Sequence, residues 1–477
     1  MARLITALLV VALLSCGLST TAAPPKLPVK DLVALLKDKQ RAVRLRTIQD
    51  LGSRGTAAKA AAAALFTVLQ EDQEQDLRLD AARALAHIGP AAVPWLIKGV
   101  KDKDWLVRQE SVRGLAMIGP EAADAVPALA DALKDPNPRS RRRAASALGE
   151  IGPAAGPAAE ALVGLLTDKD AVRAQAVRAL AKIGSAAVPD LCTALKATRR
   201  IVRQGAATAL AMIGPGASKA VPDLTRALKD ADGGVRTTAA AALAEIGPQA
   251  APAVLPLIDA LKGGTRDLRT QAAHALARIG AAAVADLVDA LQAAQPATRS
   301  NVLYVIGQIG PRATIAVPAL IEALDDKDPK VRPRAAMALG RIGPAARKAV
   351  PALTRLQRTT DRALRIAATL ALTQIEPNNQ KALERLNDLF AGYTVAKPPP
   401  GLLAQLDVGR QTLITRYIDF YVEVNNHRFG DGLSDRSKWA MAQLGPDAIP
   451  AMVRALNEEA TFNTGIVPTK VRTFYFV

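Results

Sequence analysis

An arginine recurs through most of this chain every 30 to 34 residues, and each is followed seven positions later by an aliphatic residue. Three positions further on an isoleucine recurs, and the next residue is glycine in every repeat except the last, where it is Glu376. A period of this size is typical of stacked units that share one continuous core, so 477 residues need not mean several globular domains. The recurring arginines are Arg44, Arg78, Arg108, Arg141, Arg173, Arg203, Arg236, Arg269, Arg299, Arg332 and Arg365.

One repeat, residues 89–119, shows the plan of the others. A Gly-Pro pair ends one helix, because glycine tolerates a left-handed cap and proline cannot continue the hydrogen-bond ladder. The Val-Pro pair at 93–94 begins a first helix, residues 101–104 form a polar turn, and residues 106–118 form a second helix with an apolar stripe. Some repeats carry three extra residues before the Val-Pro pair, which predicts one extra turn there.

An aspartate precedes the recurring arginine by six residues in six of the repeats. An Asp in the turn and an Arg on the following helix can form charge-assisted hydrogen bonds, which would hold each hairpin and tie the layers together. We expect no catalysis from these pairs, because the same pair recurs along the whole array. The predicted structural pairs are Asp38 with Arg44, Asp72 with Arg78, Asp102 with Arg108, Asp135 with Arg141, Asp230 with Arg236, and Asp326 with Arg332.

These residues resemble the HEAT-repeat family, in the short bacterial form that also occurs in phycobilin-lyase-like proteins. The resemblance rests on the turn aspartates, the Ile-Gly-Pro helix ends and the Val-Arg pairs, such as Val107-Arg108, and it covers residues 27–376. It implies an all-α fold, an α-solenoid superhelix of ten to eleven stacked antiparallel helix pairs, with the second helices on the concave side. It says little about function, because one fold serves many functions.

The first 23 residues predict an export signal, with Arg3 before an apolar run too short to span a bilayer. Two processing sites are open: lipidation at Cys16, or cleavage just before residue 23 or 24. We expect a periplasmic, cell-envelope or extracellular protein, and no transmembrane segment after the signal. The other cysteine, Cys192, lies in an apolar helical stretch and is expected to be a small core residue.

The end of the chain differs in composition from the repeats. Residues 377–401 form a transition and a Pro-rich linker, and residues 402–477 form a helical segment rich in aromatic side chains with one degenerate repeat. A terminal cap is the expected role, because an array must cover its last apolar face. A docking module for a partner is the alternative.

No motif for catalysis, a cofactor or a metal emerges from the sequence. The three histidines, His87, His274 and His427, are not spaced as zinc ligands, and none forms a His-Glu pair of the kind that iron-dependent HEAT hydroxylases use. There is no phosphate-binding glycine loop and no nucleophile elbow. We therefore expect no enzyme, no cofactor and no metal; the alternative is a phycobilin-lyase-like or metal-dependent HEAT enzyme, or an enzyme accessory.

The formal net charge of +18 favours anionic partners, although arginines at one structural position account for part of it. Export argues against nucleic acid, so we expect a monomeric, non-enzymatic interaction scaffold that binds an acidic protein or envelope polymer. Membrane contact is expected only through a lipid anchor. The candidate binding surface comprises basic residues five or nine positions beyond the recurring arginines, interrupted by residues such as Glu150: Arg83, Arg113, Arg178, Lys182, His274, Arg278 and Arg341.

Overall fold

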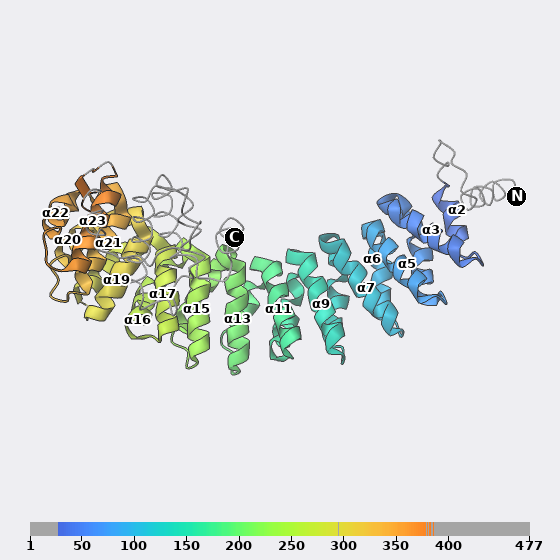
Figure 1. The fold of residues 1–477 in the computed structure, drawn as a ribbon. Coiled ribbons are helices and arrows are strands. Elements are labelled where there is room, and N and C mark those ends of the chain that lie inside the picture. The colour runs from blue at the N-terminus through green and yellow to red at the C-terminus, as the bar shows by residue number, and fades with distance from the viewer. Residues whose placement is uncertain (1–26, 294, 378, 380, 383–384, 386–477) are drawn as a thin grey trace, which may run out of the picture. The chain divides into compact units, whose positions relative to one another are not determined.

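The computed structural model describes residues 27–385, except for 294, 378, 380 and 383–384. Within these residues the chain forms eleven helical hairpins, and no strand occurs (Figure 1). The first helices are α2 (Val29–Leu35), α4 (Ala62–Glu71), α6 (Val93–Val100), α8 (Val126–Ala132), α10 (Ala159–Gly164), α12 (Val188–Ala194), α14 (Val221–Ala227), α16 (Val254–Gly263), α18 (Val284–Ala293), α20 (Val317–Ala323) and α22 (Val350–Leu356).

The second helix of each hairpin carries the recurring arginine. Residues 106–118 were predicted as such a helix, and the structure begins it one residue earlier. The second helices are α3 (Arg41–Ser53), α5 (Gln75–Ile88), α7 (Trp105–Ile118), α9 (Pro138–Ile151), α11 (Asp170–Ile183), α13 (Arg200–Ile213), α15 (Gly233–Ile246), α17 (Arg266–Ile279), α19 (Pro296–Ile309), α21 (Val331–Ile342) and α23 (Arg362–Ile375).

A short 3₁₀ helix joins each hairpin to the next one, and a glycine with positive φ begins it. Gly119, for example, has φ 70° and ψ −134°, a conformation that a residue with a Cβ atom adopts only under strain. The 3₁₀ helix has four residues in η2 (Gly89–Ala92) and seven in η3 (Gly119–Ala125). The three extra residues of some repeats therefore form the predicted extra turn.

Small residues allow the second helices to approach one another closely. A Cβ atom placed on Gly149 of α9 would lie 3.0 Å from the Cα atom of Ala179 in α11. Gly340 of α21 would meet the Cα atom of Ala371 in α23 at 2.9 Å. Figure 1 shows α9 beside α11, and α21 beside α23, and the alanine-rich composition makes this spacing accessible.

The core lies between the two helices of each hairpin and between adjacent hairpins. The aliphatic residue seven positions after each recurring arginine is part of it: Leu115, Leu148 and Leu180 have no exposed surface. Because each repeat buries its apolar side chains against the next, the repeats share one core within each stack.

Two compact units make up the chain, and their boundary falls between Ala242 and Leu243, inside α15. We call them the N-terminal and C-terminal units. Within the N-terminal unit α3, α5, α7, α9, α11 and α13 follow one another in order, and within the C-terminal unit α17, α19, α21 and α23 do so (Figure 1).

Two spans of the described residues are long and apolar enough to cross a membrane, Gly233–Gly263 and Pro296–Ala323. The expectation that no such segment follows the signal was therefore wrong by this measure. Each span consists of a second helix and the following first helix, however, and a glycine of positive φ separates the two: Gly247 and Gly310. About half of the apolar 18-residue stretch that qualifies each span is buried inside the protein, 56% and 50%. Both spans are therefore accounted for as core helices of the stack.

Candidate functional site

Most of the recurring arginines bind the turn of their own hairpin through backbone carbonyls, and Arg173 also contacts the carboxylate of Asp170 in its own hairpin. Arg141 Nη1 donates to the carbonyl of Asp135 at 2.8 Å, and Arg236 Nη1 donates to that of Asp230 at 2.6 Å. Arg44, Arg108 and Arg332 donate in the same way to the carbonyl oxygens of Asp38, Asp102 and Asp326. Arg78 differs, because its Nε donates to the carbonyl of Leu69 at 2.7 Å.

The prediction that each arginine pairs with the carboxylate of the aspartate in its own turn was therefore wrong. In the described part of the chain, none of the six arginines pairs with the carboxylate six residues before it. The carboxylate instead accepts a backbone N–H in its own turn, as Asp135 does from Asn137 at 2.7 Å. This bond fixes the turn conformation and leaves the remaining lone pairs free for another partner.

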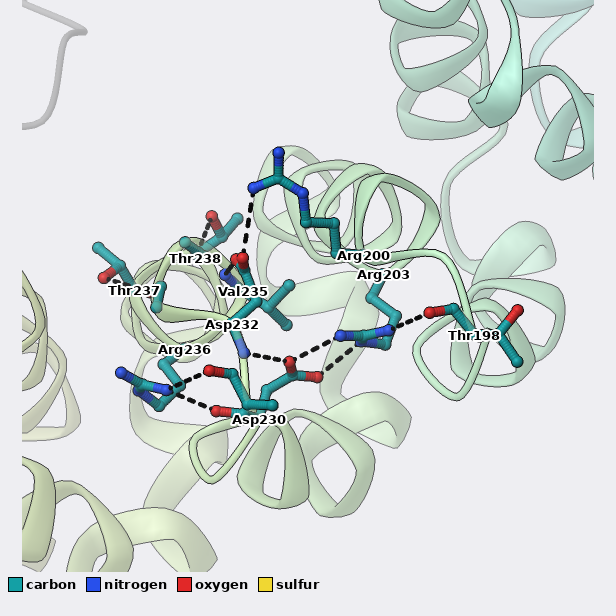
Figure 2. Close-up of polar contacts among 12 residues, drawn as sticks. Thr198, Arg200, Arg203, Asp230, Asp232, Val235, Arg236, Thr237 and Thr238 are labelled. Carbon is teal, nitrogen blue, oxygen red and sulfur yellow. Dashed lines mark hydrogen bonds and ion pairs between the residues drawn. The ribbon is translucent and has the colours of Figure 1, made fainter.

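In three of the six, Asp72, Asp230 and Asp326, the carboxylate also accepts from the arginine of the preceding repeat, and Asp104 and Asp168 do so in two other repeats. These ion pairs tie adjacent layers together. Figure 2 shows one such link: Arg203 of α13 reaches Asp230, whose carbonyl accepts from Arg236 of α15. The links are Arg44 to Asp72 (2.9 Å), Arg141 to Asp168 (2.6 Å), Arg203 to Asp230 (2.7 Å), Arg299 to Asp326 (2.8 Å), and Arg78 to Asp104. We call these five pairs the interlayer links.

The interlayer links perturb the acidity of both partners. The hydrogen bond from Arg141 holds the pKa of Asp168 below its usual value, against the opposing effect of burial. The hydrogen bond from Arg203 lowers the pKa of Asp230 in the same way, and that bond raises the pKa of Arg203. These groups stay charged at neutral pH and act as structural ties, in agreement with the structural role expected for the pattern.

The candidate binding surface is exposed only in part. Arg83, Arg113, Arg178, Lys182 and Arg278 are exposed, whereas His274 and Arg341 are half-buried. All five exposed residues have partners nearby, so the surface is not a stripe of free cations. Arg83 pairs with Asp80, Arg113 with Glu110, Lys182 with Glu150 and Arg278 with Glu245, while Arg178 donates to the amide oxygen of Gln175.

His274 and Arg341 occupy more enclosed positions in the C-terminal unit. Burial lowers the pKa of His274, and the nearby Arg278 adds to this effect while Glu245 opposes it. The Nδ1 atom of His274 is buried with no hydrogen-bond partner in the structure. Arg341 lies over the ring of Tyr304, 5.8 Å from its centroid, and this cation–π contact holds the guanidinium against α19.

The described residues offer no site for metal or thiol chemistry. No group of three or more His, Cys, Asp or Glu residues lies close enough there to hold a metal ion. Cys192 of α12 is half-buried, and burial first, then the neighbouring Asp223, raises the pKa of its thiol to about 11. Such a thiol is protonated at neutral pH and is not a nucleophile. It agrees with the expected packing role of Cys192, although the residue is only partly enclosed.

Several predictions from the sequence fall outside the described residues. These are the signal at residues 1–23 with Cys16, the linker that ends at residue 401, and the aromatic segment 402–477. They remain predictions.

Comparison with known protein families identifies the repeats. The model of HEAT repeats matches residues 62–136, 93–181, 126–211, 188–256 and 317–392, and the model of the PBS lyase HEAT-like repeat matches residues 298–326. No curated protein matches the sequence.

Solved structures with a similar course of the chain include two of Kap121p and one of Kap95p. The Kap121p structure shares 12% identity with a TM-score of 0.47, covering 94% of this chain and 56% of that chain. The complex of Kap121p with Nup53p shares 14%, with a TM-score of 0.47, and covers 89% and 54%. The structure in which Kap95p binds RanGDP shares 13%, with a TM-score of 0.43, and covers 94% and 71%.

This chain therefore spans little more than half the length of Kap121p. Likeness at this level concerns the course of the chain alone and says nothing about partners. The HEAT-repeat model, by contrast, matches more than half of the sequence, over the same residues that form the hairpins. On this match the chain belongs to the HEAT-repeat family.

Proposed function

We propose that the protein is a non-enzymatic interaction scaffold that is exported and that binds an acidic protein or envelope polymer as a monomer. The observation that carries this proposal is where the positive charge lies. Each interlayer link joins one arginine to one aspartate, so these links contribute nothing to the net charge of +18. The excess comes from side chains outside the links, where it is available to attract an anionic partner.

In the N-terminal unit, the row of second helices is the surface that would bind. It presents exposed cations on several layers, such as Arg83 on α5, Arg113 on α7 and Arg178 on α11. Each has a local partner, so each contact with an anion would be weak and exchangeable. A long row of weak contacts still gives useful affinity, because successive contacts on one partner become intramolecular.

Export is proposed from residues 1–23, with a lipid anchor at Cys16 as the alternative to cleavage. Mass spectrometry of the protein isolated from its own cells tests this. A chain that begins near residue 23 supports cleavage, and a lipid mass on Cys16 supports the anchor. An intact N-terminus without lipid contradicts export.

Pull-down from envelope extract tests the binding function. The full-length chain is immobilised and the extract is applied at about 0.05 M and about 0.5 M NaCl, conditions that differ strongly in ionic screening. An acidic partner retained at low salt and released at high salt supports the proposal. No partner, or one held equally well at both concentrations, contradicts the electrostatic mechanism.

A second candidate is an enzyme or enzyme accessory of the phycobilin-lyase-like or metal-dependent kind, and the repeat match at residues 298–326 favours considering it. Metal analysis and an absorption spectrum of the purified protein separate the two candidates. Stoichiometric metal or pigment would favour the enzyme, and its absence would favour the scaffold.

A further inference from the structure

Three arginines at the start of α9 form no ion pair within residues 27–385. Arg139 and Arg142 are exposed, and Arg143 is half-buried. Every ion pair within residues 27–385 involves other residues, and the side chains of these three make no hydrogen bond there. Arg141, which lies between them, is occupied by Asp168 in an interlayer link. Residues 139–143 therefore contain four arginines, and only Arg141 among them forms an ion pair within the described residues, with Asp168.

Two second helices pack against α9: α7 carries Arg108, Arg113 and a single carboxylate, Glu110, whereas Asp170 of α11 pairs with Arg173. Glu110 of α7 is 3% exposed and receives Arg113 Nη1 at 3.5 Å and Gln109 Nε2 at 3.1 Å. We call Arg113, Arg139, Arg142 and Arg143 the arginine cluster. Glu110 is the carboxylate that faces it, and its two oxygens are already engaged, so positive charge in the cluster is under-compensated.

The enclosed position of Arg143 makes this imbalance costly. Burial lowers the pKa of Arg143; Glu110 opposes the shift, whereas Arg142, Arg113 and Arg139 add to it. A guanidinium that has lost part of its hydration and faces like charges is stabilised by an added anion. The planar fork of an arginine also suits a carboxylate better than a lysine ammonium does.

An exposed tryptophan begins α7, the helix that packs against α9. Trp105 is the first residue of α7 and 60% of its surface is exposed, which is uncommon for so large an apolar side chain. In the first two repeats the corresponding positions are in contact. Arg41 lies three residues before the recurring Arg44, and it contacts Asp76, which lies two residues before the recurring Arg78. Trp105 and Arg139 hold these same two positions in α7 and α9.

Tryptophan and arginine are the residues most enriched at the energetic centres of protein interfaces. An anionic polysaccharide or polyphosphate would use the arginines but would have no need of the indole. The combination of charge and exposed aromatic surface therefore favours a protein.

We propose that Trp105 and the arginine cluster form a docking site for an acidic protein segment, in which carboxylates pair with Arg139, Arg142 and Arg143 and an apolar side chain covers Trp105. This inference rests on the proposed scaffold function and assigns it a location on α7 and α9. The site lies wholly within the N-terminal unit.

Synthetic peptides test the site with the full-length chain. The probe is a pool of dye-labelled peptides of about twelve residues that alternate Asp or Glu with Leu or Phe, long enough to cross two or three layers. Binding is measured by fluorescence anisotropy. The chain has three tryptophans, Trp95, Trp105 and Trp439. The emission of exposed Trp105 should shift to shorter wavelength on binding, and this shift should disappear in Trp105→Phe.

Four variants locate the binding. Trp105→Ala and the double variant Arg142→Ala, Arg143→Ala should each weaken binding about tenfold or more, as hot-spot residues do. Lys229→Ala removes an exposed, unpaired lysine on another layer of the same unit and should change affinity by less than about twofold. Arg143→Lys keeps the charge but loses the planar fork, so it should bind more weakly than the unmodified protein.

Each outcome bears on the inference. Peptide binding that is weakened by the cluster and Trp105 variants, but not by Lys229→Ala, supports it. No peptide binding, or binding unaffected by these variants, overturns the site. If the envelope pull-down still yields a salt-sensitive acidic partner, the scaffold function survives such a failure. If polyphosphate binds through the arginines and Trp105→Ala does not change that binding, the conclusion that the partner is a protein is overturned.

Discussion

Arg203 and Asp230 form a two-point ion pair between adjacent layers, with Nε to Oδ2 at 2.7 Å and Nη2 to Oδ1 at 2.9 Å. Both side chains are largely buried, 15% and 12% exposed. Asp230→Ala would leave the guanidinium without its carboxylate and would open the turn that Asp232 closes. We expect the free energy of unfolding in urea to fall by about 1–3 kcal/mol.

Two variants control for this effect. Asp230→Asn keeps an oxygen for the N–H of Asp232 but removes the charge, so its loss should be smaller than that of alanine. Asp131 forms an exposed pair with Lys101, and Asp131→Ala should cost less than about 1 kcal/mol. Equal losses for Asp230→Ala and Asp131→Ala would mean that burial adds nothing to the interlayer link.

Leu180 of α11 has no exposed surface and is therefore part of the core. Leu180→Asp would bury an unpaired charge and should destabilise the fold by more than about 4 kcal/mol, with loss of helical circular dichroism around this repeat. An unchanged thermal melt would refute its placement in the core.

Arg83 provides the contrasting surface substitution. Its side chain is 53% exposed and pairs with Asp80 on the same helix. Arg83→Glu replaces that attraction with repulsion and should lower stability by less than about 1 kcal/mol, with helicity retained. A large loss of helicity would show that this face of α5 packs against something.

Two glycines of the same repeat should respond to alanine in opposite directions. Gly184 has φ 73°, and although no atom lies within 4 Å of a Cβ placed there, an alanine would be strained and should cost at least about 1 kcal/mol. Gly164 is exposed and helical with similar open space, so Gly164→Ala should stabilise by about 0.4–1 kcal/mol. Urea unfolding of both variants measures the two changes in the free energy of unfolding. Changes of the same sign would contradict the backbone argument.

The hairpins could be predicted because their signals are local. Gly-Pro and Val-Pro pairs mark where helices end and begin, and a seven-residue step from Arg173 identifies Leu180 as core. The family match and the eleven hairpins in residues 27–385 confirm the predicted solenoid of HEAT repeats.

The partner of each arginine could not be predicted in the same way, because it depends on how one layer sits on the next. Asp135 is six residues before Arg141 and was the nearer acid in sequence, yet the carboxylate that Arg141 binds is Asp168, 27 residues later. The spacing of 27 or 28 residues also separates Arg44 from Asp72 and Arg203 from Asp230, and it is the signal that was missed.

His274 gives the C-terminal unit a pH dependence separate from that of the interlayer links. Burial lowers its pKa in the folded state, so between about pH 6.5 and that lowered value the unfolded chain binds more protons. Stability should therefore fall as the pH drops below about 6.5.

The lowered pKa values of Asp168 and Asp230 affect stability only in stronger acid. Their contribution to the free energy of unfolding is present above the unfolded pKa near 3.9 and is lost as the pH falls below it. Urea unfolding at pH 7.5 and 5.5, where the aspartates stay ionised, isolates the histidine. His274→Gln should remove most of the difference between the two; an undiminished difference would assign it to another group.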